Sequence, residues 1–242
     1  MSAYCFSDTH GCYGLWQQIK EYCKPDDIIY FLGDACDRGD DGILIMSELL
    51  KDERVVYLKG NHEDIFTIVG SEILEGVTDN IGWWLSNGGQ PTLDTFLKLP
   101  DDQQQWLLDK IKGLPKTMTY VNKDGKEIFL SHAGGRPDLT EYQMELLGHA
   151  KDPYIWDRKH INCPWPRNIK YEDVYMVHGH TPVQIITYKN DCNILNYCDG
   201  HKFDIDLASF ASCKTVLFNL DTLEVEKYFF DEKMFKETCL CD

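Results

Sequence analysis

Short apolar runs alternate with helical patterns at the start of the chain. Ala3–Phe6 and residues 28–32 and 55–59 are each largely apolar over four or five positions, which is typical of buried strands. Residues 13–22 and 43–51 lie between them and carry apolar side chains at helical spacing. The alternation predicts a β-α-β-α-β unit, in which the strands are parallel and the crossovers are right-handed.

A mostly helical pattern follows over residues 63–113, and the glycine pair and proline within residues 88–91 predict a turn between helices. Strand-like runs then return. They cover residues 117–121, 128–130, 174–177, 183–188, 193–197 and 215–219. The Asn-Lys-Asp-Gly segment at residues 122–125 is typical of a hairpin turn between the first two of these runs.

Residues 134–170 differ from the rest of the chain, because they hold four of its nine prolines and show little periodicity. This segment predicts a loop-rich insertion. No repeat, low-complexity tract or linker interrupts the sequence, so we expect a single α/β domain over residues 1–242. We also expect this domain to be a monomer.

The composition narrows the range of functions. The apolar content of 43% is that of a packed globular protein, and no run approaches the roughly 20 apolar residues that a membrane span needs. The start of the chain lacks the features of a signal peptide, and the ten cysteines include no Cys-x-x-Cys pair, so we expect a cytoplasmic protein with free thiols. A net charge of −16 disfavours nucleic acid as a partner.

Polar side chains follow five of the predicted strands, at the point where each strand ends. The segments are residues 7–11, 33–39, 60–63, 131–135 and 178–181, and each joins Asp, His or Asn to glycine. Because ligands of open α/β sheets bind outside the carboxyl ends of the strands, we expect these segments to converge on one rim. Imidazole and carboxylate groups without thiolate clusters are typical of a hydrolytic transition-metal site.

The number of these side chains predicts two metal ions, since six ligands are too many for one ion that must keep an open position. We assign to the first ion Asp8, His10 and Asp34, and to the second ion Asp34, Asn61, His132 and His180. Asp34 then bridges two divalent ions about 3.5–4 Å apart. Two divalent ions and two ligand carboxylates leave a positive centre, which suits a phosphate group.

Four further side chains have expected roles at such a centre. His62 follows the ligand Asn61, and we expect it to act as a general acid, with Asp37 orienting its imidazole. Arg38 and Arg158 are expected to bind the phosphate together with Asn61. The chain has only five arginines, so an anion site must be local and built from metal ions and one or two of these arginines.

Five motifs along residues 7–181 resemble those of a known family. They are Asp-x-His-Gly, Gly-Asp-x-x-Asp-Arg-Gly, Gly-Asn-His-Glu, Ser-His-Ala-Gly and Gly-His-Thr-Pro, in this order. Together they resemble the phosphoprotein phosphatase branch of the calcineurin-like metallophosphoesterases. Residues 84–89, 155–158 and 203–206 make the chain most similar to the phage lambda-type and bacterial serine/threonine protein phosphatases. One position departs from the pattern, since Ser7 stands where the family more often has glycine.

This resemblance implies a four-layer α/β-β/α sandwich with a dinuclear metal site at the carboxyl ends of its strands. It also implies Mn, Fe or Zn ions, with Mn expected to serve in vitro, and a phosphorylated protein or peptide as the substrate. The reaction would be one-step hydrolysis of phosphoserine or phosphothreonine. The ligands, the acid pair of His62 and Asp37, and the two arginines assigned above agree with the family pattern.

Two other functions remain open for the chain. A symmetrical diadenosine tetraphosphatase shares these motifs, although a tetraphosphate would need more basic residues than this chain offers. A non-catalytic scaffold is the other alternative, and the intact ligand set argues against it. Among single residues, Asp37 has the alternative role of a helix N-cap, Glu63 is expected to cap the helix that it opens, and His149 is expected at the surface.

Overall fold

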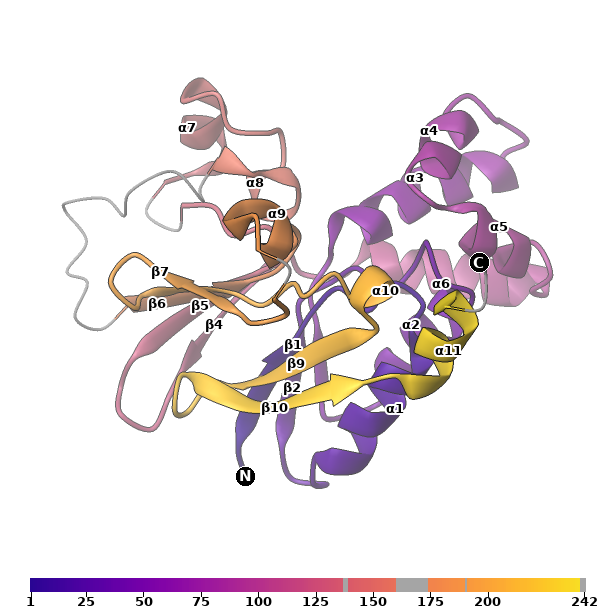
Figure 1. The fold of residues 1–242 in the computed structure, drawn as a ribbon. Coiled ribbons are helices and arrows are strands. Elements are labelled where there is room, and N and C mark those ends of the chain that lie inside the picture. Colours follow the sequence, from indigo (N-terminus) through magenta and orange to yellow (C-terminus); the bar gives the residue numbers. More distant parts are fainter. Residues whose placement is uncertain (137–138, 160–173, 190, 240–242) are drawn as a thin grey trace.

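Two five-stranded sheets form the centre of the protein, in a computed structural model that describes residues 1–136, 139–159, 174–189 and 191–239 (Figure 1). The first sheet contains β1 (Ala3–Phe6), β2 (Ile28–Phe31), β3 (Val55–Tyr57), β9 (Lys214–Asn219) and β10 (Glu224–Phe230). The second contains β4 (Thr117–Val121), β5 (Glu127–Ser131), β6 (Val174–His178), β7 (Leu195–Tyr197) and β8 (Lys202–Asp204). The strand orders are β10-β9-β1-β2-β3 and β4-β5-β6-β8-β7.

Helices connect and cover these strands. Those before the second sheet are α1 (Tyr13–Tyr22), α2 (Gly42–Leu49), α3 (Asn61–Leu74), α4 (Ile81–Ser86), α5 (Gln90–Phe96) and α6 (Asp101–Lys112). The later ones are α7 (Glu141–Leu146), α8 (Pro153–Trp156), α9 (Val183–Thr187), α10 (Ser209–Ser212) and α11 (Glu232–Cys239). Among the described residues, no helix combines the length and apolar character needed to cross a membrane.

The first three strands form the predicted β-α-β-α-β unit. β1 pairs in parallel with β2, and β2 pairs in parallel with β3, while α1 and α2 are the crossovers. β9 joins the other side of β1 in the antiparallel direction, with Cys5 opposite Phe218. The carboxyl ends of β1, β2 and β3 therefore lie along one edge of the first sheet.

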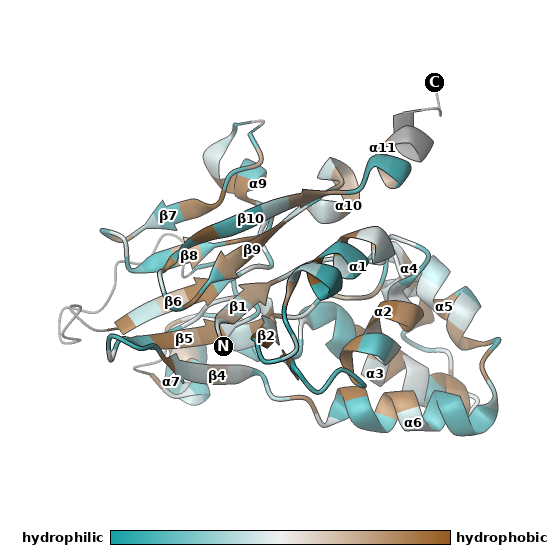
Figure 2. Ribbon diagram, turned by 90° about the horizontal axis from the view of Figure 1, so that it is seen from below, coloured by the Kyte–Doolittle hydropathy of each residue, from teal (hydrophilic) through white to brown (hydrophobic). Residues whose placement is uncertain are grey.

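The side chains of β1 divide between two hydrophobic cores. Tyr4 and Phe6 belong to the core between the first sheet and helices α1 to α6. Ala3 and Cys5 belong to a second core, which also contains Leu130 of the second sheet. Because successive side chains of a strand point to opposite faces, β1 is buried on both sides. Figure 2 shows the resulting contrast between the brown central strands and the alternating teal and brown of α6 at the edge.

Helix α8 lies on the outer face of the second sheet, where the Tyr154 ring packs against Phe129 of β5 with centroids 5.6 Å apart. The neighbours of Phe129 on the strand, Ile128 and Leu130, face the other way into the core between the sheets. The order from one side to the other is therefore helices, first sheet, second sheet and helices. This arrangement confirms the predicted α/β-β/α sandwich.

One predicted strand is wrong. Residues 183–188 were expected to be extended because Val, Ile and Thr dominate them, but the structure has helix α9 at Val183–Thr187. Pro182 precedes the helix, and its carbonyl accepts hydrogen bonds from the N–H groups of Ile185 and Ile186. The buried Val183 side chain joins the core between the sheets. Tertiary packing and the proline together outweigh the strand propensity of the segment.

The predictions for the later part of the chain are incomplete. Strands β8 and β10 were not predicted, and the loop-rich insertion contains the short helices α7 and α8, while residues 160–173 lie outside the described part of the structure. His149 was expected at the surface. It is buried instead, and its Nδ1 lies 2.8 Å from Oδ2 of Asp157, because the insertion folds back on itself around this pair.

Candidate functional site

The loops that follow β1, β2, β3, β5 and β6 meet at one rim of the sandwich. Backbone hydrogen bonds join them: the N–H of Asp8 donates to the carbonyl of Gly33 at 3.0 Å, and the N–H of Gly179 donates to the carbonyl of His132 at 2.8 Å. Gly33 has a φ of 100°, and a Cβ atom there would lie 2.4 Å from the backbone nitrogen of Gly60. Only glycine therefore allows the loops after β2 and β3 to approach so closely.

The backbone at this rim adopts left-handed conformations that are uncommon for residues with side chains. Positive φ values between 43° and 74° occur at Asp8, His10, Asp34, Asp37, Arg38 and His180. Such conformations cost roughly 1–3 kcal/mol each and persist only where the surrounding structure holds them. All six are residues to which the sequence assigns a role, so the strain and the predicted chemistry coincide.

Two groups of side chains at the rim could each hold a metal ion, and they share one carboxylate. The first group is His10, Asp34 and His62, and the second is Asp34, His132 and His180. Within each group the candidate ligand atoms lie within 4.8 Å of one another, and all five residues are buried. Oδ2 of Asp34 lies 3.6 Å from Nε2 of His10 and 3.3 Å from Nε2 of His132. Asp34 thus occupies the central position that the sequence predicts for it.

The orientation of His132 shows that its inward nitrogen faces other electron-rich atoms. Its Nδ1 is 2.9 Å from the carbonyl oxygen of Leu32 and donates to it, so a neutral ring has its lone pair on Nε2. That Nε2 lies 2.9 Å from Oδ1 of Asn61 and 3.2 Å from Nδ1 of His180. Such a set repels itself unless a proton or a metal cation lies among the lone pairs. The donors present therefore fit a divalent transition metal.

The charges of the buried side chains at the rim also fit a metal cation. Burial would raise the pKa of Asp34, but His132 and His62 outweigh it and hold this pKa well below the usual value. Burial would lower the pKa of His132, but Asp34 and Asp8 raise it to about 9. Without an ion, a proton on His132 supplies the positive charge that the buried carboxylates require. A metal cation satisfies the same electrostatic demand.

Asp8 is buried beside these two groups. It falls in neither metal-binding group of the described residues, and His62 completes the first group in its place. The buried Asp8 carboxylate accepts hydrogen bonds from the Ser7 hydroxyl and, at 3.1 Å, from the N–H of His180. Ser7, the residue that departs from the family pattern, therefore contacts a predicted ligand directly.

Glu63 holds the loop that carries Asp34, the predicted bridging ligand. Its buried carboxylate accepts hydrogen bonds from the N–H groups of Asp34 and Ala35, both at 2.7 Å, and from that of Gly60 at 2.8 Å. The Tyr57 hydroxyl donates to it as well, at 2.8 Å. Glu63 caps the start of α3, as the sequence predicts, and also fixes the loop that carries Asp34.

His62 and Asp37 form the predicted pair. Nδ1 of His62 lies 2.7 Å from Oδ2 of Asp37, and Nε2 of His62 lies 3.8 Å from Oδ2 of Asp34. The indole N–H of Trp84 donates to both Asp37 oxygens, at 3.0 and 3.1 Å. Asp37 is not a helix N-cap, because α2 begins later and its N-cap is Asp41. Although burial opposes it, Asp34 and Asp37 raise the pKa of His62.

The two predicted phosphate-binding arginines flank the group of ligands. Arg38 lies with Nη1 2.6 Å from Nε2 of His10 and Nη2 3.2 Å from Nε2 of His62. Arg158 donates from Nη1 to the Thr181 hydroxyl at 2.9 Å. The structure therefore brings the six predicted ligands, His62 and Asp37, and both arginines to one rim.

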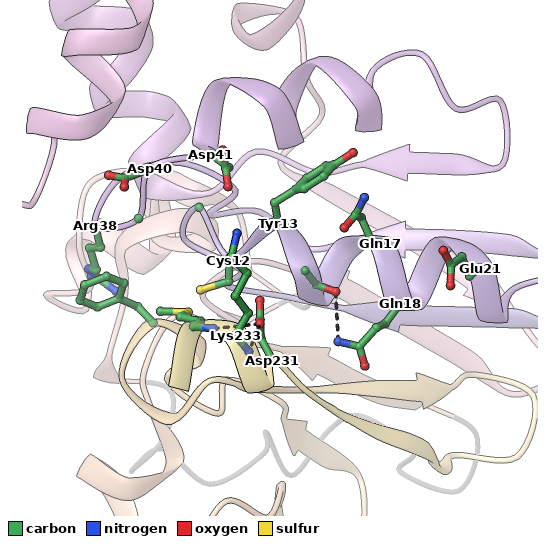
Figure 3. A pocket seen from close by; sticks show the side chains of 15 residues that line it. Cys12, Tyr13, Gln17, Gln18, Glu21, Arg38, Asp40, Asp41, Asp231 and Lys233 are labelled. Atoms are coloured by element: carbon green, nitrogen blue, oxygen red, sulfur yellow. Dashed lines mark hydrogen bonds between the residues drawn. The ribbon is translucent and has the colours of Figure 1, made fainter. Parts of the chain in front are cut away.

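A hollow of about 560 Å³ extends from Arg38 along α1 (Figure 3). In this view Arg38 and Asp40 lie at one end and Glu21 lies at the other. Asp41 and Asp231 add two more carboxylates to its lining. Lys233 lines the hollow as well, so four carboxylates face two cations and the hollow is predominantly acidic.

Some residues that organise the site were not predicted to do so, although the motifs contain them. Thr181 belongs to the Gly-His-Thr-Pro motif, and Trp84 begins the segment at residues 84–89. Trp84 is fully buried, and its bond to Asp37 depends on the packing of α4. The role of Ser7 had no signal other than its departure from the family pattern.

The chain belongs to the calcineurin-like phosphoesterase family, because the model of that family matches residues 1–210. Symmetrical bis(5'-nucleosyl)-tetraphosphatases of Buchnera aphidicola are similar to part of it. The protein from subsp. Acyrthosiphon pisum (strain 5A) is 30% identical over 145 residues, which are 57% of this chain and 46% of that protein. The protein from subsp. Schizaphis graminum (strain Sg) is 26% identical over 157 residues, which are 60% of this chain and 51% of that protein. The chain spans about half the length of the curated relatives that it matches.

Solved structures share the fold at low sequence identity. A candidate diadenosine tetraphosphatase superposes with a TM-score of 0.63 at 13% identity, covering 96% of this chain and 94% of that one. A serine/threonine protein phosphatase from Saccharomyces cerevisiae superposes with a TM-score of 0.53 at 12% identity, covering 96% and 81%. These structures support the metallophosphoesterase fold and do not separate one branch of the family from another.

We expect Glu63→Gln to lower the free energy of unfolding by about 2–3 kcal/mol, because each carboxylate oxygen accepts from two donors and the amide would replace one of these oxygens with an NH2 group, which leaves two buried donors without an acceptor. Urea unfolding followed by circular dichroism measures this loss. Glu53→Gln, at an exposed position, is the control and should change stability by less than about 0.5 kcal/mol. Equal stability of the two variants would show that Glu63 does not hold the site loops.

Proposed function

We propose that this chain is a metal-dependent phosphomonoester hydrolase that removes phosphate from serine and threonine side chains of proteins. The observation that carries the proposal is the buried Asp34 carboxylate, shared between two groups of imidazoles and flanked by Arg38. The same rim contains a histidine with a carboxylate partner, which supplies a proton donor. Metal ligands, an arginine and a general acid together are what hydrolysis of a phosphate ester requires.

The proposed metal ligands are the six that the sequence indicates, with Asp34 bridging the two ions. They are Asp8, His10, Asp34, Asn61, His132 and His180. Two divalent ions held there would neutralise phosphate oxygens and lower the pKa of a water molecule toward neutrality. We propose Mn in vitro, and the imidazole and carboxylate donors also suit Fe or Zn.

Arg38 and Arg158 would bind the phosphate group of the substrate. The guanidinium of Arg38 lies beside the imidazoles of His10 and His62, 2.6 and 3.2 Å from their Nε2 atoms. Bound cations would repel it from this position and free its N–H groups for two phosphate oxygens. Arg158 donates to the Thr181 hydroxyl, which follows the ligand His180, and the side chain of Asn61 lies beside His132.

His62 would protonate the leaving oxygen of the serine or threonine. Its Nδ1 is engaged by Asp37, so Nε2 is the nitrogen that faces the site. Asp37 in turn is held by the Trp84 indole, which keeps the carboxylate in place while the imidazole is charged. The arrangement can therefore deliver a proton at a defined position, and a serine alkoxide needs that proton in order to leave.

A second candidate is hydrolysis of dinucleoside tetraphosphates, because the curated relatives are named for that activity. The acidic hollow beside Arg38 favours the protein substrate instead. Glu21, Asp40, Asp41 and Asp231 line it and would repel a long polyphosphate chain. A peptide with lysine or arginine near its phosphorylated residue would meet no such repulsion.

After purification and reloading with Mn, we expect two Mn ions per chain in the parent protein. We expect no more than one in Asp34→Asn, because this variant loses the shared carboxylate. Metal analysis after gel filtration measures the stoichiometry. Turnover of p-nitrophenyl phosphate should vanish on chelation, return with Mn, and fall at least roughly 100-fold in the variant. Two ions per chain and full turnover in Asp34→Asn would exclude a bridging role for this residue.

We expect His62→Gln to lower kcat on a phosphoserine peptide by about 10²–10⁴-fold, because the serine oxygen of the peptide leaves only when a general acid protonates it. Turnover of p-nitrophenyl phosphate should fall by less than about 10-fold, since nitrophenolate leaves without a proton. His201→Gln, away from the rim, is the control for both substrates. Equal losses on the two esters would assign His62 a role other than that of a general acid.

The substrate class is tested by parallel steady-state assays of a phosphothreonine peptide and of diadenosine tetraphosphate on the same Mn-loaded protein. We expect kcat/KM for the peptide to exceed that for the dinucleotide by at least about tenfold, because the acidic hollow repels the polyphosphate. A high-salt series should narrow the difference as the charges are screened. Faster hydrolysis of the dinucleotide at low salt would exclude the protein phosphatase function and support hydrolysis of dinucleoside tetraphosphates instead.

A further inference from the structure

A second hollow, of about 900 Å³, adjoins both predicted phosphate-binding arginines. Arg38, Arg158 and His180 form its inner end. Helices α9, α10 and α11, which follow one another across the molecule in Figure 1, contribute its outer lining. Its volume lies in the range of pockets that enclose an organic ligand and is far larger than one phosphate group requires.

The walls of this hollow are apolar and partly aromatic. Ile185 of α9, Phe210 of α10 and Phe235 of α11 are 61%, 38% and 47% exposed, and all three line it. Phe230 completes the wall, with its ring centroid 5.4 Å from that of Phe235. Large apolar side chains from separate elements thus gather beside the phosphate position. Exposed apolar surface that is concentrated in this way is typical of a binding site.

The charged residues that line this hollow are all cationic. They are Arg38, Arg158 and Lys214, and no carboxylate occurs among its described lining side chains. The hollow along α1 differs, because four carboxylates and two cations line it, and a purely cationic lining is unusual in a chain with a net charge of −16. Arg38 and Phe210 line both hollows, so the two meet at these side chains, one of which is a predicted phosphate-binding residue. A substrate bound there would extend between an acidic side and an apolar side.

We propose that the hollow of 900 Å³ is a specificity pocket for an aromatic side chain of the phosphoprotein, two residues away from the phosphorylated serine or threonine. The proposal rests on the proposed function. In an extended peptide, side chains two residues apart project from the same face, so they enter neighbouring parts of one site. Phe210 and Phe230 would pack against the bound ring, and such packing adds to the free energy of burial.

The test uses a series of phosphothreonine peptides that differ only in having Phe or Ala two residues before or after the phosphothreonine. We expect the Mn-loaded protein to favour one Phe peptide over its Ala counterpart by about 10–100-fold in kcat/KM, mainly through KM. In Phe210→Ala and in Ile185→Ala this ratio should fall toward one, because each variant removes part of the apolar wall. Phe210→Leu should restore most of it.

Tyr142→Ala is the matched control, because Tyr142 is an exposed aromatic residue on α7 that does not line the hollow. It should leave the Phe-to-Ala ratio unchanged. Thermal unfolding of each variant, compared with the parent chain, separates a change in specificity from a loss of folded protein. A ratio near one in the parent chain, with both peptides hydrolysed well, would overturn the pocket while leaving the protein phosphatase function intact.

The remaining outcomes bear on the pocket and the function separately. Hydrolysis of p-nitrophenyl phosphate without hydrolysis of any phosphopeptide would overturn the proposed function, and the pocket for a protein side chain with it. A loss of diadenosine tetraphosphate turnover in Phe210→Ala, with no preference among the peptides, would assign the hollow to a nucleobase instead. A Phe preference that Phe210→Ala removes and Tyr142→Ala retains supports the proposal.

Discussion

The burial of the Asp34 carboxylate is the constraint on which the rest of the site depends. A charge in that position is stable only with positive partners and with hydrogen bonds to its loop. His10, His62 and His132 surround its oxygens, and Glu63 holds the loop from the opposite side by accepting three backbone N–H bonds. The surroundings of Asp34 therefore combine excess negative charge with electron-rich imidazole nitrogens, a combination that two divalent cations satisfy.

The two sheets are what bring these partners together. β1, β2 and β3 supply the loops with Asp8, Asp34 and Asn61, whereas β5 and β6 supply His132 and His180 from the second sheet. The core between the sheets fixes the distance between these two sets of loops. Two hollows of different character meet at Arg38, one in which carboxylates outnumber cations and one lined by apolar rings and cations. The chemistry and the surface that selects a substrate thus share one edge of the fold.

Much of the fold and of the candidate site was predictable from the sequence, wherever the local pattern and the tertiary structure agree. The parallel strands, their crossovers, and the convergence of the polar segments on one rim follow from apolar runs that end in Asp, His or Asn beside glycine. Prediction failed where local propensity and packing disagree. Residues 183–188 have the composition of a strand, but Pro182 and the burial of Val183 make them helical. β10 has exposed charged positions among its apolar ones, which hide a strand pattern.

The sequence by itself determined which atoms are available for chemistry, because the side chains at strand ends are set by short motifs and by the glycines that let the backbone turn. Only the tertiary structure decided how those side chains act on one another. The bond from Trp84 to Asp37, the fourfold hydrogen bonding of Glu63 and the position of Phe210 between two hollows join residues from elements that are far apart along the chain. Such contacts depend on how sheets and helices pack, and packing is a property of the whole chain that no local pattern encodes.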